Sequence, residues 1–176
     1  KYTLIQNRLK FIKKLGVNMT IEANDTFPAH TLRLIVDGEL QEVESAEYLA
    51  GKKLMLVGVP GAFTPTCHAS HLPGYIEHLA SFEAKGYSVN FISVNDPFVM
   101  MAWSEASAAT GINMIADGNG DLTNALGLVM DASGFGLGKR CMRFAMAIED
   151  GVVKSIDVEE GGALDVSSAE SQLAKI

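Results

Sequence analysis

The residue best placed to do chemistry is Cys67, which ends the run Val59-Pro60-Gly61-Ala62-Phe63-Thr64-Pro65-Thr66-Cys67. The apolar stretch 54–59 before the turn predicts a strand. Thr64 can cap a helix with its hydroxyl, and Pro65 suits the first helical position. Cys67 then lies in the first helical turn, where unpaired N–H groups and the positive end of the helix dipole favour a thiolate. The sequence therefore predicts a nucleophilic cysteine at a helix start.

Strands and helices alternate along the rest of the chain. Apolar patterns and turn signals predict strands at 31–36, 53–59, 87–94, 114–115, 143–148 and 152–158, and helices at 67–85, 97–110, 121–126 and 167–174. The strand at 53–59 is apolar throughout, which indicates a central strand buried on both faces. This order of elements predicts an α/β protein with a mixed central sheet flanked by helices.

Local signals mark several boundaries of these elements. Asp37-Gly38 and Asp150-Gly151 are typical of hairpin turns. Asp96 is a good N-cap for the helix at 97–110, and Ser167 with Glu170 forms a capping-box pattern for the last helix.

Pro73 lies inside the helix that Cys67 begins. Its missing N–H cannot bond the Ala69 carbonyl, so we expect a kink or bulge there. Two interpretations remain open. The kink strains turns that must unwind before Cys67 can meet a reductant, or it serves packing alone.

Composition limits the classes of function. The chain has 176 residues, 48% of them hydrophobic, and a formal net charge of −7, which predicts one domain with a proper core. An acidic body is a poor binder of nucleic acid, and no apolar run is long enough to span a membrane. Its two cysteines do not form a disulfide framework, which indicates a reducing compartment or one that is served by reductases.

Residues 1–18 differ from the remainder, residues 19–176. They carry five basic side chains and no acidic one. We interpret 1–18 as an extension, either upstream or expression sequence before Met19 or the remnant of an organellar transit peptide. The expected location is the cytoplasm, with the mitochondrion or a plastid as the alternative if 1–18 is a transit remnant.

Four segments together resemble the peroxiredoxin family. Pro60, Thr64 and Cys67 match its P-x-x-x-T-x-x-C pattern, and PGAFTPTC followed by His71-Leu72-Pro73-Gly74 is similar to the peroxiredoxin-5, or type II, group. The likeness continues through Ser93 to Met100 and through Arg143-Phe144, and it ends near Ser167 to Glu170. It covers about residues 19–176.

The resemblance implies a thioredoxin-like fold and a thiol peroxidase that acts in cell redox homeostasis as an antioxidant. Cys67 would attack hydrogen peroxide or an alkyl hydroperoxide and become a sulfenic acid. Thr64 would hydrogen-bond the sulfur and the peroxide, and Pro60 would shield the thiolate from water. The backbone N–H of Cys67 could donate to the peroxide. None of these steps requires a cofactor or a metal.

Two more positions follow from the same resemblance. The family arginine stands just before an aromatic residue, which Arg143-Phe144 matches, and its fork of donors suits two oxygens. Arg140 is the competing candidate, and a purely surface role for Arg143 is the other reading. His71 matches a family position and is expected to hydrogen-bond inside the pocket. His68, His71 and His78 together could suggest a metal site, but no second ligand set supports one.

Cys141 decides how the sulfenic acid is resolved. It lies outside both regions where relatives carry a second cysteine, which here read 89–92 and 162–166. On a regular strand it would share a face with Arg143 and approach the active site. The alternative is a small buried filler, and we favour that one. We then expect one-cysteine chemistry in which glutathione, glutaredoxin or thioredoxin completes turnover.

The resulting prediction is a homodimeric thiol peroxidase packed through the edge of its active-site pocket. A competing class is a redox sensor or holdase that uses the oxidation of Cys67 as a signal. General thiol–disulfide exchange is a third possibility, but the chain has no C-x-x-C pair.

Overall fold

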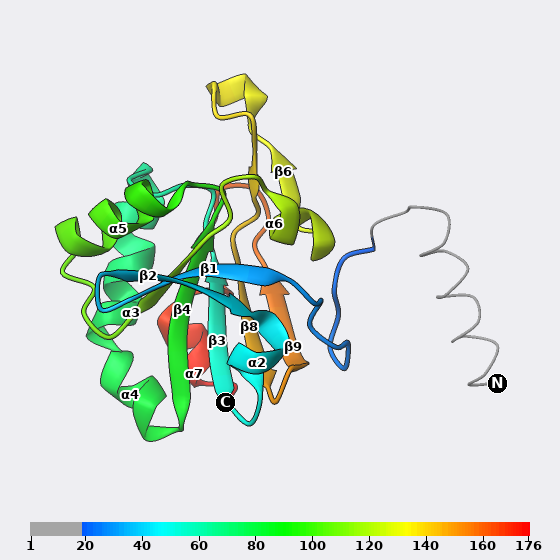
Figure 1. Ribbon diagram of the computed structural model, residues 1–176. Coiled ribbons are helices and arrows are strands. Elements are labelled where there is room, and N and C mark those ends of the chain that lie inside the picture. The colour runs from blue at the N-terminus through cyan, green and yellow to red at the C-terminus, as the bar shows by residue number, and fades with distance from the viewer. Residues whose placement is uncertain (1–18) are drawn as a thin grey trace.

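A seven-stranded mixed sheet forms the centre of the structure, a computed structural model that describes residues 19–176 (Figure 1). Its strands lie in the order β2-β1-β5-β4-β3-β8-β9. They are β1 Thr31–Val36, β2 Glu39–Glu44, β3 Lys53–Gly58, β4 Tyr87–Ser93, β5 Asn113–Ala116, β8 Phe144–Glu149 and β9 Val152–Val158. The three central strands β3, β4 and β5 are parallel, and the outer pairings are antiparallel. The predicted mixed sheet with a central β3 is confirmed.

Short helices flank the sheet. They are α2 Ser45–Leu49, α3 Leu72–Glu77, α4 Leu79–Ala84, α5 Pro97–Ala106, α6 Asp121–Ala125 and α7 Ala169–Leu173, with a π-helical turn η1 at Cys67–His71. A small hairpin of β6 Val129–Asp131 and β7 Lys139–Cys141 projects from the body, with the 3₁₀ turn η2 at Ser133–Phe135 near its tip (Figure 1). The β6–β7 hairpin was not predicted from the sequence.

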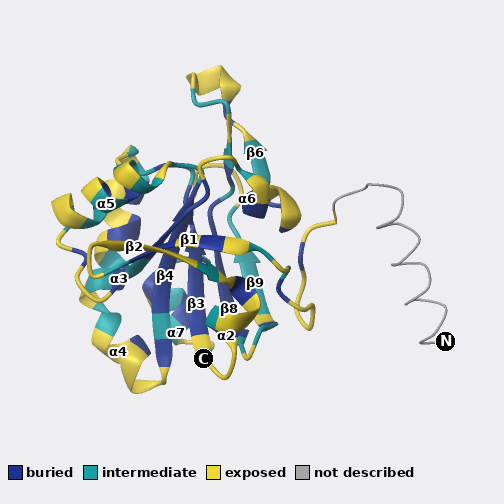
Figure 2. Cartoon of the chain, in the orientation of Figure 1, coloured by how far each residue is buried: buried dark blue, intermediate teal, exposed yellow. Residues whose placement is uncertain are grey.

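The sheet separates two apolar layers. On one face α3, α4, α5 and α7 cover buried residues such as Met55, Val57 and Phe91, and Cys67 belongs to this layer. On the other face α2 and α6 cover Leu54 and Leu56. Figure 2 shows the central strands as the most continuously buried part of the chain. Alternation along each strand assigns successive side chains to opposite layers, as the pleat requires.

The two predicted hairpin turns are confirmed. Asp37 and Gly38 have φ of 50° and 80°, and Asp150 and Gly151 have φ of 48° and 75°. Two successive residues with positive φ match the right-handed twist of the flanking strands.

Two predicted helices are shorter than expected. The helix predicted for 67–85 is divided into η1, α3 and α4, with a break at His78, where φ is −98° and ψ is 7°. The helix predicted for 97–110 begins as expected, because the Asp96 carboxylate accepts from Val99 N, but it ends at Ala106. Ala108, with φ of 51°, cannot continue a right-handed helix.

The last helix begins one residue later than its capping-box pattern predicts. Ser168, not Ser167, is the N-cap, and its hydroxyl accepts from the backbone N–H of Ser171 at 3.2 Å. The Ser167 hydroxyl donates instead to Glu159. Two neighbouring serines can each begin a helix, and the tertiary partner of Ser167 decides between them.

Gly58 brings the start of β8 against the end of β3. The two strands pair in register at Gly58 and Phe144, and a Cβ on Gly58 would lie 2.1 Å from the Phe144 ring. Only glycine allows this approach. Because Phe144 faces one layer, Arg143 immediately before it is directed to the other, where Cys67 lies.

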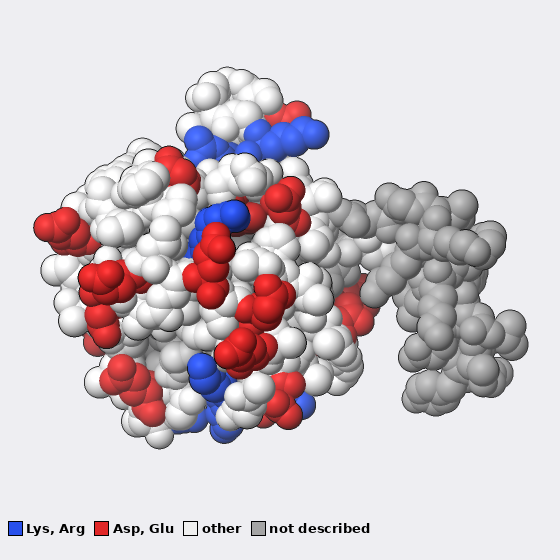
Figure 3. Space-filling model, viewed as in Figure 1, with Lys and Arg blue, Asp and Glu red and all other residues white. Residues whose placement is uncertain are grey.

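No helix among residues 19–176 is long and apolar enough to cross a bilayer. On the face in Figure 3 acidic side chains form separate patches over the body, and basic side chains lie on the β6–β7 hairpin, near the centre and at the lower edge.

Candidate active site

Cys67 lies at the start of the π-helical turn η1, on the loop that follows β3. Its side chain is completely buried. The backbone N–H of Leu72 donates to the Cys67 carbonyl, five residues back, which is the bond that defines a π turn. Pro73 occupies the first turn of α3, where it needs no N–H partner. The bulge that the sequence predicted near Pro73 is therefore present as a widened turn.

The loop before Cys67 is held by a neighbouring segment. Asn95 Oδ1 accepts from Ala62 N at 2.9 Å and from Ser93 Oγ at 2.7 Å. Phe63 has a φ of 63°, which an apolar side chain rarely adopts. The segment that follows β4 therefore holds the loop before Cys67 through Asn95.

Thr64 has a different hydrogen bond from the predicted cap. Its hydroxyl donates back to the Gly61 carbonyl at 2.7 Å and closes the loop. The turn that follows has no side-chain cap, while the Thr64 carbonyl accepts from His68 N at 2.9 Å. The predicted side-chain cap is wrong, because the reversed loop at Phe63 places an acceptor closer to the hydroxyl than the helix N–H groups.

Arg143 and Cys67 meet inside the protein. Arg143 is 6% exposed, and its Nη2 lies 3.4 Å from Cys67 Sγ. Its Nε is buried without a hydrogen-bond partner in the described chain. The side chain therefore places one donor on the sulfur and has another to spare. The predicted burial of Arg143 beside Cys67, rather than on the surface, is what the structure shows.

His71 connects Arg143 to the far wall of the site. Its Nδ1 lies 2.9 Å from Arg143 Nη1, and its Nε2 lies 3.0 Å from the Ser167 carbonyl. A carbonyl only accepts, so Nε2 carries the proton, and Nδ1 accepts from the guanidinium. Burial lowers the pKa of His71 to about 4, so the ring is neutral at physiological pH. The expected hydrogen bond of His71 inside the pocket is confirmed.

The Ser167 segment is itself fixed from two sides. Its carbonyl also accepts from the Tyr75 hydroxyl at 2.8 Å, and its N–H and hydroxyl both donate to Glu159 Oε1. Although partial burial opposes it, hydrogen bonds from the backbone N–H groups of Ser167 and Asp165 lower the pKa of Glu159. A continuous path of contacts thus runs from Glu159 through Ser167, His71 and Arg143 to the sulfur.

Two further residues that the sequence analysis considered, Pro60 and Arg140, do not contact the Cys67 sulfur by any hydrogen bond in the described chain. Pro60 is half-buried at the start of the loop that leads to Cys67. Arg140, the competitor of Arg143, donates to the carbonyls of Leu137 and Val94 and braces the hairpin instead. The structure therefore separates the two arginines by position.

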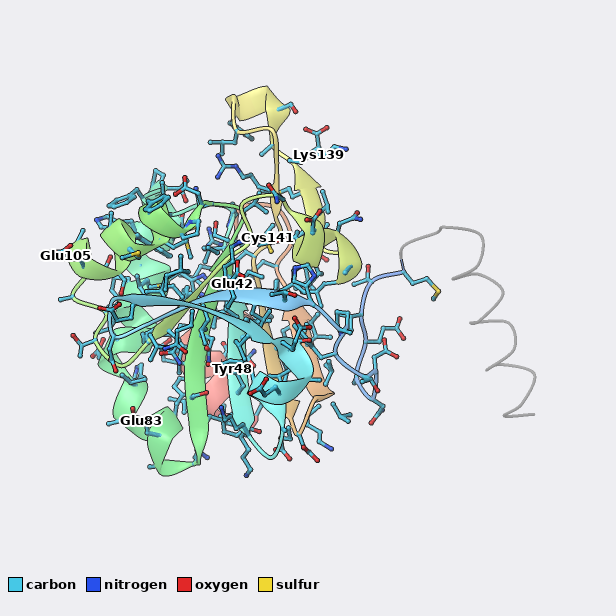
Figure 4. The ribbon with its side chains drawn as sticks, viewed as in Figure 1. Glu42, Tyr48, Glu83, Glu105, Lys139 and Cys141 are labelled. Carbon is cyan, nitrogen blue, oxygen red and sulfur yellow. The ribbon has the colours of Figure 1, made fainter. Side chains whose placement is uncertain are left out.

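Cys141 lies on the opposite side of the sheet from Cys67. It packs with Phe144 and Met146, in the layer covered by α2 and α6. Figure 4 places it where the β6–β7 hairpin joins the body. The less favoured alternative, a face shared with Arg143, does not hold, because the strand is interrupted at 142–143 between β7 and β8. The favoured interpretation, a small buried filler, agrees with the complete burial of Cys141. Burial raises the pKa of Cys141 to about 12; a hydrogen bond with Thr123 opposes this effect and the negative charge of Asp117 adds to it.

The other histidines of the segment do not gather around a metal. Within 19–176 no group of three His, Cys, Asp or Glu side chains is placed to hold an ion. His78 pairs with Glu170 on the surface. His68 accepts a hydrogen bond from Trp103, and Trp103 is part of the core as expected.

Sequence reasoning missed the supporting residues of the site. Asn95 was recognised only as part of a matching segment, and Glu159 was not singled out. Asn95 acts through Ala62, 33 positions away, and Glu159 acts through Ser167, 8 positions away. The sequence signal that could have indicated both residues is their polar character close to segments that resemble the family.

Comparison with known proteins agrees with this geometry. The profile of the Redoxin family matches residues 22–173. Peroxiredoxin-2E-2, chloroplastic, of Oryza sativa subsp. japonica is 48% identical over 88% of this chain and 72% of its own length. Peroxiredoxin-2B of Arabidopsis thaliana is 42% identical over 87% of this chain and 96% of its own length.

Solved structures give the same result. Reduced Prx3 from Vibrio vulnificus, in complex with hydrogen peroxide, superposes with a TM-score of 0.83 at 46% identity and covers 88% of this chain and 98% of its own. The thioredoxin-like fold is thereby confirmed. The chain belongs to the peroxiredoxin family and is a thiol-dependent peroxidase.

Proposed function

We propose that Cys67 is the peroxidatic nucleophile and that it reduces hydrogen peroxide and alkyl hydroperoxides. The observation that supports this most directly is the buried contact of 3.4 Å between Arg143 Nη2 and Cys67 Sγ. A buried guanidinium stabilises negative charge on the sulfur that it contacts. The Vibrio relative in complex with hydrogen peroxide supports the substrate class.

The reaction is a two-electron transfer at sulfur. The Cys67 thiolate attacks the terminal oxygen of the peroxide, the S–O bond forms and the O–O bond breaks. Sulfur is oxidised to a sulfenic acid, and the departing alkoxide or hydroxide takes a proton to become an alcohol or water. The two oxygens gain charge as the bond breaks, which the donors of Arg143 can stabilise.

The other site residues have supporting roles in this proposal. Arg143 Nε, buried without a partner, is a donor available for a peroxide oxygen. The Thr64 hydroxyl, which already donates to Gly61, can still accept from the proton of the peroxide. Pro60 limits access of water to the sulfur from the loop side, and the backbone N–H of Cys67 is a further donor. His71 orients Arg143.

An external thiol completes the cycle in this proposal. Cys141 is completely buried on the opposite face from Cys67, which supports a mechanism with one reacting cysteine. Glutathione, glutaredoxin or thioredoxin would attack the sulfenic sulfur, release water and form a mixed disulfide. A second thiol then regenerates Cys67.

A homodimer is part of the proposal. Phe98 in the first turn of α5 is 77% exposed, and Phe63 on the Cys67 loop is 47% exposed. Exposed aromatic residues beside a site are typical of protein interfaces. Sedimentation should show a dimer that Phe98→Ser weakens. A monomer for the unaltered protein at high concentration would contradict this.

The compartment is likewise proposed. We expect a cytoplasmic protein, with a mitochondrial or plastid location as the alternative. The plastid alternative is supported by the similar rice protein, which is named as chloroplastic. Fluorescence microscopy of the tagged chain in the source cells would distinguish them.

Peroxide consumption with different thiol donors tests the central proposal. The unaltered protein should consume peroxide with glutathione and glutaredoxin or with thioredoxin, and Cys67→Ser should abolish it while near-UV circular dichroism stays unchanged. Steady consumption by Cys67→Ser would overturn the assignment of the nucleophile. A single oxidation of the unaltered protein without any turnover would favour a sensor.

A further inference from the structure

His68 follows the buried Cys67 directly, but its own side chain is exposed. Its ring is tilted by 35° against the ring of Phe63, with centroids 5.6 Å apart. On its other side, Nδ1 lies 3.2 Å from Nε1 of Trp103. His68 is therefore the point where the Cys67 turn touches both the preceding loop and helix α5.

The direction of the second contact is fixed by chemistry. The indole Nε1–H is a donor only, so His68 Nδ1 must be the acceptor. Trp103 is completely buried and packs against Phe91 at 6.0 Å between ring centroids. If His68 moved away, this buried N–H would lose the partner that it has in the structure. An unsatisfied buried donor is costly enough to change a conformational equilibrium by about tenfold.

Reduction of the oxidised enzyme requires such a movement. The Cys67 side chain is completely buried, so the sulfur of a glutathione or of a reductant protein cannot reach it in this conformation. Cys67 must come out of η1 before a mixed disulfide can form. His68 is the next residue along the chain, and it cannot keep its place against Trp103 when Cys67 leaves.

Arg143 contacts Cys67 at the start of η1, and His71 at its end is hydrogen-bonded to Arg143 and to the Ser167 carbonyl. A π turn is wide and rare, and η1 lacks a side-chain cap. Pro73 has no N–H to offer to the carbonyls of the turn. The hydrogen bond between His68 and Trp103 adds a separate link, from η1 to helix α5.

We propose that His68 is a positioning residue whose hydrogen bond with Trp103 holds Cys67 in the peroxide-reactive conformation and opposes the unwound, reductant-reactive one. The inference rests on the proposed role of Cys67. It assigns to His68 the balance between two fates of the sulfenic acid. In the folded site the sulfenate attacks a second peroxide, its sulfur gains an oxygen as a sulfinate, and an alcohol or water leaves. In the unwound form it reacts with a thiol.

Two substitutions separate the hydrogen bond from the bulk of the side chain. His68→Leu has a similar size but no acceptor, whereas His68→Asn has Oδ1 near the place of Nδ1. His78→Leu is a matched control, because it removes a histidine that pairs with Glu170 outside the π turn. Amide hydrogen exchange of residues 67–72 in the reduced protein reports opening of the turn. Trp103 is the sole tryptophan of the chain, so its emission reports the indole environment.

In His68→Leu, exchange of the 67–72 amides should accelerate about tenfold, and the emission of Trp103 should change. The fraction of Cys67 converted to sulfinate per turnover, measured by mass spectrometry at limiting thiol, should fall by a similar factor. His68→Asn should restore all three readouts toward the unaltered protein, and His78→Leu should leave them unchanged.

Exchange and sulfinate yield within twofold of the unaltered protein in His68→Leu would overturn the proposal. So would equal effects in His68→Leu and His68→Asn, since the bond would then not be the cause. If His68→Leu fails to fold, Trp103→Phe removes the donor instead and must show the same faster exchange. If peroxide did not oxidise Cys67 in the unaltered protein, the proposed function would be refuted instead. The exchange measurement on the reduced protein does not depend on that function, so the two failures can be distinguished.

Discussion

Arg143 donates from Nη1 to Nδ1 of His71 across 2.9 Å, and this bond sets the direction in which Nη2 points at Cys67 Sγ. The acceptor exists only because the Ser167 carbonyl holds the proton of His71 on Nε2. A neutral imidazole can orient a buried guanidinium without cancelling its charge, as a carboxylate would. The full positive charge of Arg143 thus remains available to the sulfur and to a peroxide.

The neutral state of His71 predicts a pH dependence of stability. Burial lowers the pKa of His71 to about 4, whereas an unfolded histidine has its ordinary pKa near 6.5. Between these values the unfolded chain binds a proton that the folded chain does not bind, so the free energy of unfolding decreases as the pH falls. The decrease should approach about 3 kcal/mol near pH 4.

Urea unfolding between pH 7 and pH 4 measures this effect. His71→Asn keeps an acceptor for Arg143 but does not titrate, so its stability should vary much less over this range. His78→Asn, on the surface, is the control and should follow the unaltered protein. The pKa of Glu159 is lowered from the ordinary glutamate value of 4.5. Its contribution to the free energy of unfolding is therefore lost only as the pH falls below about 4.5. Equal pH profiles for all three proteins would contradict the lowered pKa and the neutral state of His71.

Arg143→Gln should slow the second-order reaction with peroxide by about 10²-fold or more, as expected for the loss of one oxyanion donor. Stopped-flow measurement on the reduced protein gives this rate directly. Arg140→Gln is the matched control, because Arg140 donates to backbone carbonyls of the hairpin and does not touch Cys67. It should change the rate by less than about threefold. A larger effect at Arg140 than at Arg143 would restore Arg140 as the candidate.

Thr64→Val tests whether the hydroxyl acts on the peroxide. Because the hydroxyl would position the peroxide by accepting its proton, its removal should lower the same rate by about 10²-fold, and Thr64→Ser should keep most of it. The hydroxyl also closes the loop through Gly61, so the melting temperature of both variants must be compared. A large loss of stability with a rate changed less than threefold would show that the hydroxyl only holds the loop.

The sequence predicts those features of the fold that depend on near neighbours. The strand at 53–59, the turns at Asp37-Gly38 and Asp150-Gly151, and the Asp96 cap each follow from a local pattern, and all are confirmed. The Thr64 and Ser167 caps were wrong because the competing partners, Gly61 in a reversed loop and Glu159 after β9, become available only through backbone geometry or tertiary folding. A capping rule that considers only neighbouring residues in the sequence cannot take such hydrogen-bond partners into account.

The candidate site divides in the same way. Cys67, Thr64 and Pro60 stand close together in the chain, so their spacing was informative. Arg143 was placed by its neighbour Phe144 and by resemblance, whereas the contact that holds it comes from His71, 72 positions away, and His71 is held in turn by the Ser167 carbonyl. The position of Cys141 could not be derived, since a break of two residues between β7 and β8 reverses the face that strand alternation predicts.

Turnover should not need Cys141. Its pKa is raised to about 12 by burial, so at neutral pH almost none of it is the thiolate that attacks a sulfenic acid. It also lies in the layer opposite Cys67, and a disulfide requires Cα atoms within about 7 Å and converging Cβ vectors. Cys141→Ser can keep the hydrogen bond to the Thr123 side chain, so it should fold and retain most thiol-dependent peroxidase activity.

Mass spectrometry after one equivalent of peroxide without thiol completes this test. Cys67 should be found as sulfenic or sulfinic acid, and Cys141 as a free thiol. Cys141→Ala provides a second variant if the serine hydroxyl is not accommodated among Phe144 and Met146. A Cys67–Cys141 disulfide as the main product, together with lost turnover in both variants, would show that the sheet end opens during catalysis. Cys141 would then be the resolving cysteine despite its place behind the sheet.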